Sequence, residues 1–394
     1  MMDDAYKQLK SELNSELKNI LSYWTKNTLD QKYGGFVGRI DHDNKIIPKA
    51  SKGVILNTRI LWSFSATSNH LKTNEYVAVC TRAFSYLKTF FNDENNKGVF
   101  WEVDYDGKPL NKRKQVYAQA FTIYALSEYY LLTKNEAAKN WAIELFELLE
   151  KFAKDEVHLG YFEAFNEDWS PIEDMRLSEK DMNASKTMNT HLHVLEAYTS
   201  LLKIYDIQPL RASLKMLVEV FFEKFLNDRN HYELFFDDEW NLLSNTVSYG
   251  HDIEAAWLVI DAAIMLNDEV LLQKANKIAL RVADTFLKEA IDEEGAVLNE
   301  KNTITKYIDT DRHWWPQVEA LIGLDYAYRL NNDKNYIKAS LKIWEYTKTH
   351  LIDHKNGEWF FRVAKDGTVY TEEDKVSMWK APYHTTRACI LLNH

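Results

Sequence analysis

The residues best suited to chemistry in this sequence are three histidines, each of which lies beside aromatic or acidic neighbours. In the segment YGHDIEAAW, His251 and Glu254 are three residues apart and project from the same face of a helix. A carboxylate in that position can orient an imidazole and raise its basicity. Since the ordinary pKa of histidine is about 6.5, an imidazole can both accept and donate protons near neutrality. His193, His251 and His384 therefore indicate acid–base catalysis.

Other chemistries have less support. His191 and His193 in THLH are two residues apart on a helix and diverge, and the sequence has no HExxH, so we expect no metal site. Neither a GxSxG sequence nor a phosphate-binding P-loop is present. A glycosidase with paired carboxylates stays possible, because Glu254, Glu319 and Asp181 could all face one cleft. A single buried histidine is usually a core residue, so the argument depends on several of them gathering.

The elements that position these residues are indicated by an internal repeat. Short aromatic segments recur in polar, turn-rich stretches, with steps of 63, 62, 72, 63 and 62 residues, beginning at Gly35, Gly98, Gly160, Tyr232, Gly295 and Gly357. Their alternating apolar and polar residues predict short strands or hairpins. Each interval between them has helical periodicity and room for two helices. We expect twelve helices near residues 5–25, 51–67, 72–91, 114–132, 136–152, 186–204, 208–226, 250–266, 268–287, 312–330, 334–350 and 378–392.

The two helices of each pair differ in polarity. YKQLKSELNSELKNIL has one apolar stripe and a charged back, whereas AAWLVIDAAIML is apolar almost all round. Alternating outer and inner helices, six of each, predict an all-α (α/α)6 barrel with short β-hairpins in its long loops. An open solenoid is the alternative, but the apolar first and last pairs favour closure. We expect residues 1–394 to form one domain.

Antiparallel pairs place every long loop on one face, at the N-termini of the inner helices. Helix N-termini carry unsatisfied N–H groups and positive potential, which suit oxygen-rich ligands. The early turns of the inner helices should therefore bring together the candidate residues, which are Arg59, Tyr117, Asn189, His191, His193, His251, Glu254, Trp257, Trp315, Glu319, Trp379 and His384.

Composition limits the partners. With a net charge of −11, the chain is a poor candidate for binding nucleic acid or an anionic membrane. No segment has the roughly 18 consecutive apolar residues of a membrane span, and the polar start does not resemble a secretion signal. Two cysteines, Cys80 and Cys389, fit a reducing, cytoplasmic location. The 12 Trp and 22 Tyr suit binding of sugars, which have apolar faces and many hydroxyl groups.

Several segments in the same order along the chain resemble the N-acylglucosamine 2-epimerase superfamily, and most closely its cellobiose 2-epimerase branch. They are SKGVILNTRILWSFS, MNTHLHVLEAYT, YGHDIEAAWL, HWWPQVEAL and KAPYHTTRAC. The resemblance covers nearly the whole chain. It implies the (α/α)6 barrel, epimerisation at C2 of a sugar's reducing end, a β-1,4-linked disaccharide such as cellobiose or lactose as substrate, and no metal or redox cofactor. We expect a monomer or weak homodimer.

The resemblance also implies roles for individual residues. His251 and His384 would be the acid/base pair, with Glu254 supporting His251. His193 would assist in the polar network, and Arg59 would bind the oxygens at C1 and C2. Sugar faces would lie on Trp315 and Trp379. The remaining pocket residues would be Tyr117, Asp181, Asn189, Trp257 and Glu319, of which Asp181 lies in a variable loop.

Alternatives remain at this stage. An aldose–ketose isomerase would share the histidines but deliver the proton to C1, and an N-acylglucosamine 2-epimerase would be expected to respond to nucleotides. The HWWPQ segment and Trp379, five residues before His384, favour a disaccharide. A carbohydrate-binding or scaffold protein would explain the aromatic residues and the repeat, but not the histidines.

Overall fold

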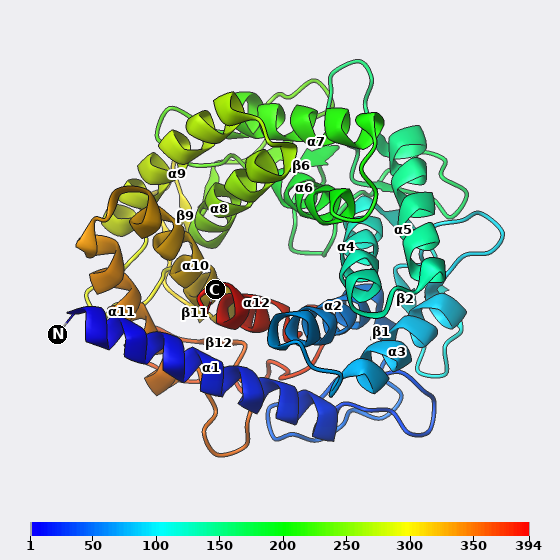
Figure 1. Cartoon of the computed structure of the whole chain (residues 1–394), viewed down its shortest axis with the longest axis horizontal. Coiled ribbons are helices and arrows are strands. Elements are labelled where there is room, and N and C mark those ends of the chain that lie inside the picture. The colour runs from blue at the N-terminus through cyan, green and yellow to red at the C-terminus, as the bar shows by residue number, and fades with distance from the viewer. Residues whose placement is uncertain (1, 394) are drawn as a thin grey trace.

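Two concentric rings of helices form an (α/α)6 barrel, which confirms the fold predicted from the repeat (Figure 1). The computed structural model describes residues 2–393. The inner ring consists of α2 (Val54–Leu71), α4 (Val116–Thr133), α6 (Met188–Leu202), α8 (Tyr249–Leu266), α10 (Trp314–Asn331) and α12 (Tyr383–Leu391). The outer ring consists of α1 (Met2–Asn27), α3 (Val77–Tyr86), α5 (Glu136–Leu148), α7 (Gln208–Val220), α9 (Glu269–Glu289) and α11 (Lys334–His350).

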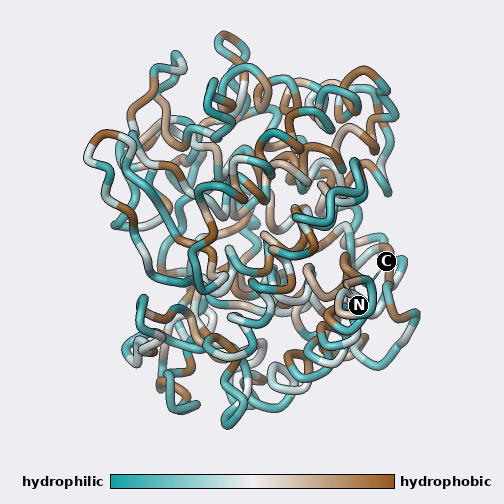
Figure 2. The backbone as a smooth tube through the Cα atoms, turned by 90° about the vertical axis from the view of Figure 1, so that its left-hand side faces the viewer, coloured by the Kyte–Doolittle hydropathy of each residue, from teal (hydrophilic) through white to brown (hydrophobic). Residues whose placement is uncertain are grey.

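Side-chain polarity separates the two rings. Helix α8 is buried on nearly every side, as expected of a helix enclosed by neighbours in both rings. Helix α9 has a single buried stripe, made of Leu271, Ala275, Ile278, Ala279, Val282, Ala283 and Phe286. Hydrophobic and hydrophilic segments accordingly alternate along the helices in the side view of Figure 2. Burial of these apolar faces is the main source of the barrel's stability.

Three of the turns from an inner to an outer helix have the same two-residue sequence feature. Helices α4, α8 and α10 end at a residue in the left-handed conformation, which is Lys134, Asn267 or Asn332. The next residue caps the following outer helix by accepting backbone N–H groups, and it is Asn135, Asp268 or Asp333. A helix stop followed directly by an N-cap makes each connection short and the pair antiparallel.

The ring closes where the ends of the chain meet. Helix α1 packs against both α11 and α12, so the first and last helices complete the outer and inner rings.

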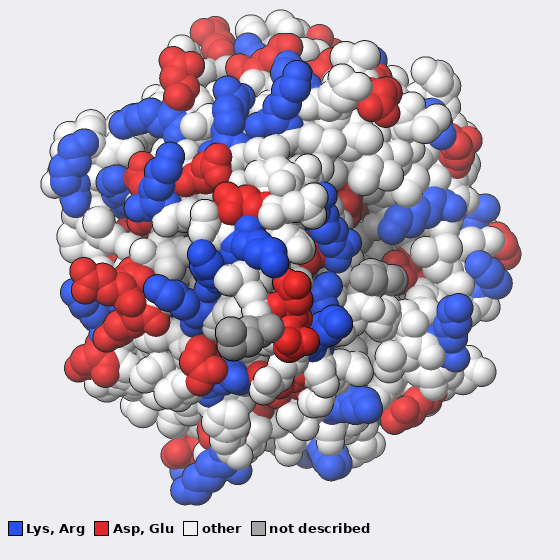
Figure 3. Space-filling view, turned by 60° about the vertical axis from the view of Figure 1, so that its left-hand side comes forward, with Lys and Arg blue, Asp and Glu red and all other residues white. Residues whose placement is uncertain are grey.

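No helix within residues 2–393 combines the length and the apolar character that a membrane crossing needs. Basic and acidic side chains are interspersed on the face that Figure 3 shows.

Short antiparallel strands join the long loops on one face of the barrel. The strand before an inner helix pairs with a strand in the loop that precedes the next inner helix, as in β4 (Lys114–Gln115) with β5 (Ala164–Phe165). The other strands are β1 (Lys52–Gly53), β2 (Glu102–Val103), β3 (Pro109–Asn111), β6 (Lys186–Thr187), β7 (Phe235–Phe236), β8 (Thr246–Ser248), β9 (Glu300–Asn302), β10 (Ile308–Asp309), β11 (Arg312–His313) and β12 (Arg362–Val363). They form the sheets β1-β2-β3, β4-β5, β6-β7, β10-β9-β8 and β11-β12.

Buried ion pairs fix these loops, and they repeat around the ring. Lys114 in β4 binds Asp93 at 2.6 Å, and Asp93 also accepts two backbone N–H groups in the turn before Gly98. The same arrangement joins Lys52 to Asp30, Lys186 to Asp155 and Lys375 to Asp353. Each aspartate therefore stabilises both a turn and the segment that leads into the next inner helix.

Two helices begin five residues later than predicted, at 77 instead of 72 and at 383 instead of 378. The outer helix expected from residue 72 begins at Val77, because Lys72 adopts a left-handed conformation that ends α2. The last helix begins at Tyr383 and not near residue 378, because Pro382 disfavours helix in the residue before it. Three outer helices end in a π-helical turn, at Leu87–Phe91, Leu149–Ala153 and Phe221–Phe225. Cys80 and Cys389 are both buried and free of disulfide bonds.

Candidate active site

A cavity of about 190 Å³ opens on the loop face, among the early turns of the inner helices. Its lining residues are Arg59, Tyr117, Asn189, His193, His251, Glu254, Trp314, Trp315, Phe361, Trp379 and His384. The inner helices converge there with their N-termini, so residues far apart in the sequence face one space. Of the residues to which the family resemblance assigns a role, all line this cavity except Asp181, Trp257 and Glu319. His191 also lies outside it, and its ring accepts the backbone N–H of Tyr161.

Two of the three histidines are held by a carboxylate. Nδ1 of His384 lies 2.7 Å from Oε1 of Glu319, and Nδ1 of His193 lies 3.0 Å from Oε2 of Glu196. A carboxylate is an acceptor only, so each Nδ1 carries the proton and donates it. Each Nε2 therefore carries the lone pair and is the atom that can act as a base.

His251 is hydrogen-bonded to Ser248 and not, as expected, to Glu254. Its Nδ1 lies 2.8 Å from Oγ of Ser248, and burial lowers its pKa to about 4. Glu254, which was expected to support His251, is bound instead by Arg387. The i, i+3 spacing places Glu254 on the correct face of α8, but the guanidinium offers it a stronger partner than a neutral imidazole does. The expected Glu254–His251 pairing is therefore wrong.

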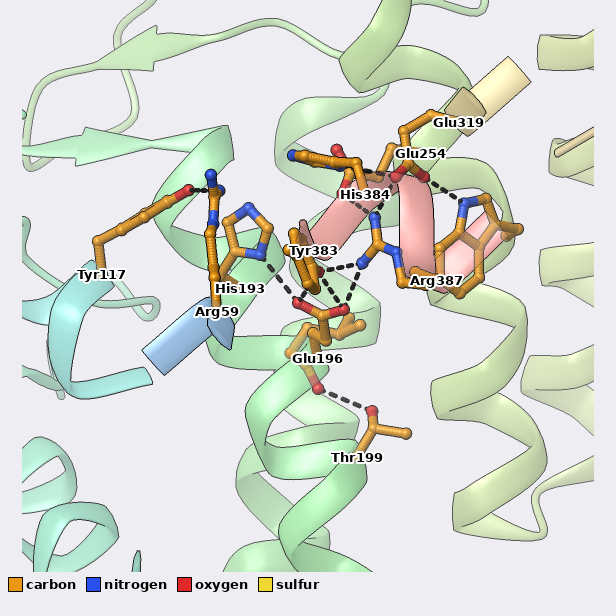
Figure 4. A network of polar contacts seen from close by, with 12 residues as sticks. Arg59, Tyr117, His193, Glu196, Thr199, Glu254, Glu319, Tyr383, His384 and Arg387 are labelled. Atoms are coloured by element: carbon orange, nitrogen blue, oxygen red, sulfur yellow. Dashed lines mark hydrogen bonds and ion pairs between the residues drawn. The ribbon is translucent and has the colours of Figure 1, made fainter. Parts of the chain in front are cut away.

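The centre of the site is Arg387, a buried residue on α12 that binds three carboxylates (Figure 4). One terminal nitrogen donates to Glu196 and to the hydroxyl of Tyr383, and the other donates to Glu254 and to Glu319. We call these residues, Arg387 with Glu196, Glu254 and Glu319, the arginine clamp. Two of its carboxylates hold His193 and His384, so the clamp fixes the orientation of both rings.

Burial and the clamp act on the pKa values in opposite directions. Burial raises the pKa of Glu196, but the charge of Arg387 and the contact with His193 outweigh it and bring the pKa to about 2. For Glu319, burial outweighs Arg387 and its pKa is raised. Burial lowers the pKa of His384 well below its usual value, although the charge of Glu254 opposes this. The pKa of His193 is also lowered, because burial outweighs the effect of Glu196. The histidines are thus neutral at pH 7.

Arg59 is a second buried cation, and its charge is not neutralised directly. It donates to the carbonyl oxygen of Trp379 and to the hydroxyl of Tyr117, both at 2.9 Å, and forms no ion pair with a carboxylate of residues 2–393. Its guanidinium lies over the rings of Phe121 and Tyr383. A guanidinium at a cavity wall that is not paired with a carboxylate can bind an oxyanion, including one that develops during a reaction.

Aromatic rings form the remaining walls. The ring of Trp315 lies close to two imidazoles, with its centroid 4.8 Å from that of His251 and 5.5 Å from that of His384. Trp379 contacts Trp101 and Tyr117 at the other side of the cavity. Both tryptophans are partly exposed, so their faces are available to the apolar side of a sugar ring.

Asp181 belongs to a neighbouring cavity of about 270 Å³, which shares Asn189 and His251 with the first one. Its carboxylate accepts from the backbone N–H and the hydroxyl of Ser178 in the same loop. Trp257 and Glu319 were expected in the pocket but lie behind it, where Trp257 donates to Glu319 at 3.2 Å. The two cavities together leave room for a ligand longer than one sugar ring.

A metal ion fits this site poorly. Glu254, Glu319 and His384 do present possible ligand atoms within 4.8 Å of one another. Arg387 donates to both of these carboxylates, however, so a positive charge already lies between them. An ion would have to displace a buried guanidinium and leave it without partners, which is unfavourable.

The chain belongs to the N-acylglucosamine 2-epimerase family, whose sequence profile matches residues 34–388. It is 42% identical to a cellobiose 2-epimerase of Bacteroides fragilis over 98% of both chains. A cellobiose 2-epimerase of Dictyoglomus turgidum is 37% identical, again over 98% of both chains. The solved structure of cellobiose 2-epimerase from Bacillus thermoamylovorans superposes with a TM-score of 0.93 at 37% identity and covers 98% of each chain.

Sequence analysis missed Glu196, Tyr383 and Arg387. A signal was present, because Glu196 follows His193 by three residues and Arg387 follows His384 by three, so each pair shares one helix face. Ser248 also lies three residues before His251. The same spacing that drew attention to Glu254 could have identified these partners.

Proposed function

We propose that the protein is a cellobiose 2-epimerase, which interconverts the reducing-end glucose and mannose of β-1,4-linked disaccharides. The observation that carries the proposal is the placement of two neutral imidazoles, His251 and His384, beside Trp315 in one cavity with the buried Arg59. Similarity to cellobiose 2-epimerases over nearly the whole chain supports the same activity.

The reaction begins when the reducing-end ring opens to its aldehyde, because the carbonyl group acidifies the hydrogen on C2. The Nε2 atom of one imidazole takes the C2 proton, and the electrons of the broken C–H bond form the C1–C2 double bond of an enediolate. Arg59 stabilises the negative charge that develops on the oxygen at C1. A proton then returns to C2 with the opposite configuration, so no atom is gained or lost.

The other residues position the reacting groups. Glu319 keeps the proton of His384 on Nδ1, so that Nε2 faces the substrate. The hydroxyl of Ser248 is hydrogen-bonded to Nδ1 of His251 and so fixes the orientation of that ring. His193, held by Glu196, and Asn189 offer hydrogen bonds to the sugar hydroxyls at the cavity wall. Glu254 acts through the arginine clamp, and Tyr117 acts through Arg59.

Two proton routes fit this site. In the first, one of His251 and His384 takes the C2 proton, and the other, after taking up a solvent proton on Nε2, delivers that proton to the opposite face of the enediolate; the first imidazole then returns its proton to solvent. In the second, the enediolate rotates about C2–C3 and one imidazole serves twice. The two routes differ in deuterium oxide. The two-histidine route places solvent deuterium at C2 in every turnover, whereas a single imidazole can return the original proton.

The second cavity supports a disaccharide. It adjoins the first through Asn189 and His251, and its lining includes Glu163, Asp181, Glu300 and Phe235. With the reducing-end sugar beside the histidines, the neighbouring sugar reaches either this cavity or the face of Trp379. Carboxylates and an aromatic ring are groups that bind sugar hydroxyls and sugar faces.

The proposal also covers organisation and location. Residues 1–394 would act as one catalytic domain, as a monomer or weak homodimer in the cytoplasm, without a metal, redox cofactor or nucleotide. Two free, buried cysteines support a reducing compartment. A paired-carboxylate glycosidase is disfavoured, because Glu254 and Glu319 are both bound by Arg387 and so are not free to protonate or attack a glycosidic bond.

The experiment that tests the proposal is incubation with cellobiose and with lactose in deuterium oxide, with the products identified by NMR. We expect a disaccharide with mannose at the reducing end. A ketose product would assign the chain to the aldose–ketose isomerases, and free monosaccharides would assign it to the glycosidases. Unchanged sugars would indicate a binding protein.

A further inference from the structure

A separate cavity of about 310 Å³ lies at the opposite end of the inner helices from the candidate active site. Its lining runs from the middle of α2, α4, α6, α8 and α12 toward their C-terminal ends. The residues are Trp62, Ala66, Asn69, His70, Tyr124, Glu128, Glu196, Thr199, Ser200, Lys203, Trp257, Leu258, Asp261, Arg387, Ile390 and Leu391. Within residues 2–393, no residue lines both this distal cavity and the candidate active site.

The arginine clamp is the partition between the two cavities. Arg387 and Glu196 line the distal cavity, while their neighbours His193, Glu254 and His384 line the active site (Figure 4). A molecule in the distal cavity would therefore contact the clamp from behind without reaching the reacting sugar. The distal cavity is a site of its own and not an extension of the proposed substrate pocket.

Polar groups in the distal cavity have unused hydrogen-bonding capacity. Glu128 accepts from Asn69 at 2.6 Å through Oε1, and Asp261 accepts from Tyr326 at 2.7 Å through Oδ1. The second oxygen of each carboxylate has no such partner among residues 2–393. The indole N–H of Trp62, which also lines this cavity, is buried and has no hydrogen-bond partner within that part of the chain. Buried polar groups are normally paired, so an unpaired N–H at a cavity wall points to a ligand or water.

The remaining wall is aromatic. Trp62 and Tyr124 stack with ring centroids 5.0 Å apart, and Trp257 contributes a further ring. Charges of both signs surround this wall. The acidic groups are Glu128, Glu196 and Asp261, and the basic groups are Lys203 and Arg387. A cation would be repelled by the two basic groups and an anion by the three carboxylates. A neutral ligand with many hydroxyls can donate to the carboxylates, accept from Lys203 and pack its apolar face on the rings.

We propose that the distal cavity binds a neutral, polyhydroxylated molecule of about the size of a monosaccharide. The test uses myo-inositol, which has no carbonyl group and so cannot enter the epimerisation reaction. Its binding to the full-length protein is measured by saturation-transfer NMR, with Asp261→Asn and Ser200→Ala as distal variants and Trp379→Ala as the active-site control. The amide oxygen that Asp261→Asn introduces can still accept from Tyr326, and thermal unfolding shows that each variant is folded.

We expect myo-inositol to bind the unaltered protein and the Trp379→Ala protein alike. Its Kd should rise about tenfold in Asp261→Asn, which is the loss of one charge-assisted hydrogen bond. Ser200→Ala should weaken binding of myo-inositol less than Asp261→Asn does. It is the variant to use if Asp261→Asn does not fold. The proposal is overturned if myo-inositol does not bind, if only Trp379→Ala weakens its binding, or if choline or phosphate binds in the distal cavity and myo-inositol does not.

Discussion

Oε1 of Glu319 accepts two hydrogen bonds, one from Nδ1 of His384 at 2.7 Å and one from Arg387 at 2.6 Å. A single buried oxygen thus connects an imidazole proposed for catalysis to the cation at the centre of the barrel. Glu196 makes the equivalent connection between His193 and Arg387. The orientation of two histidines on different helices therefore depends on one arginine.

Glu319→Gln should reduce kcat for cellobiose by about 10- to 100-fold, with little change in KM, as expected when a group that orients a reactive imidazole is replaced. An amide can still accept from Nδ1, but it no longer stabilises the imidazolium that forms when His384 takes a proton. Steady-state kinetics of both epimers would measure this split. Glu150→Gln is the matched control, since Glu150 binds Tyr161, Tyr198 and Ser213, and none of these residues lines the candidate active site. A normal kcat in Glu319→Gln would contradict the proposed role of Glu319.

Arg387→Met should destabilise the protein by about 3–5 kcal/mol, because it leaves three buried carboxylates without their cation. Unfolding in urea near pH 7 would measure the loss. The difference from the unaltered protein should shrink as the pH falls, since without Arg387 the pKa of Glu196 is no longer held near 2 and the carboxyl can be protonated. Equal stability of the two proteins at pH 7 would show that the clamp is not a structural unit.

The fold could be predicted from the sequence because each repeat has the same local features, namely helical periodicity of apolar residues and residues that favour turns. Apolar periodicity distinguishes α8 from α9, and turn residues such as Asn267 and Asp268 mark where one ends and the other begins. The cluster of histidines was also predictable, because helix N-termini in a closed ring must converge. Partners on other helices, such as Glu319 for His384, were not predictable, because they depend on distances between helices. Arg387 takes Glu254 away from His251, and no spacing within one helix reveals that competition.

The pH profile of kcat/KM should lack the acidic limb near pH 6.5 that is usual for histidine. Burial lowers the pKa of His251 to about 4 and lowers that of His384 well below its usual value. A base must be deprotonated to act, so activity should persist as the pH falls below 6.5 and decline only toward about pH 4. Kinetics from about pH 4 to 9 would measure this, with unfolding followed at each pH. A limb at pH 6–7 in the folded protein would mean that the base is a more exposed group.

Trp379→Ala should raise KM for cellobiose by about tenfold or more and affect glucose less, because a large stacking surface for the second sugar is lost. The carbonyl oxygen that holds Arg59 belongs to the backbone and is retained. Comparing kcat/KM for the two sugars isolates the contribution of the ring. Equal losses for both would place Trp379 against the reducing-end sugar alone.

The central claim is that His251 and His384 move the proton at C2. It is tested most directly by measuring the initial rate at which cellobiose becomes its reducing-end mannose epimer in His251→Asn and His384→Asn. Circular dichroism would verify that both variants are folded. We predict that each rate falls by at least about 10²–10⁴-fold, the contribution typical of a general acid or base. A near-normal rate in either folded variant would contradict the role assigned to that histidine.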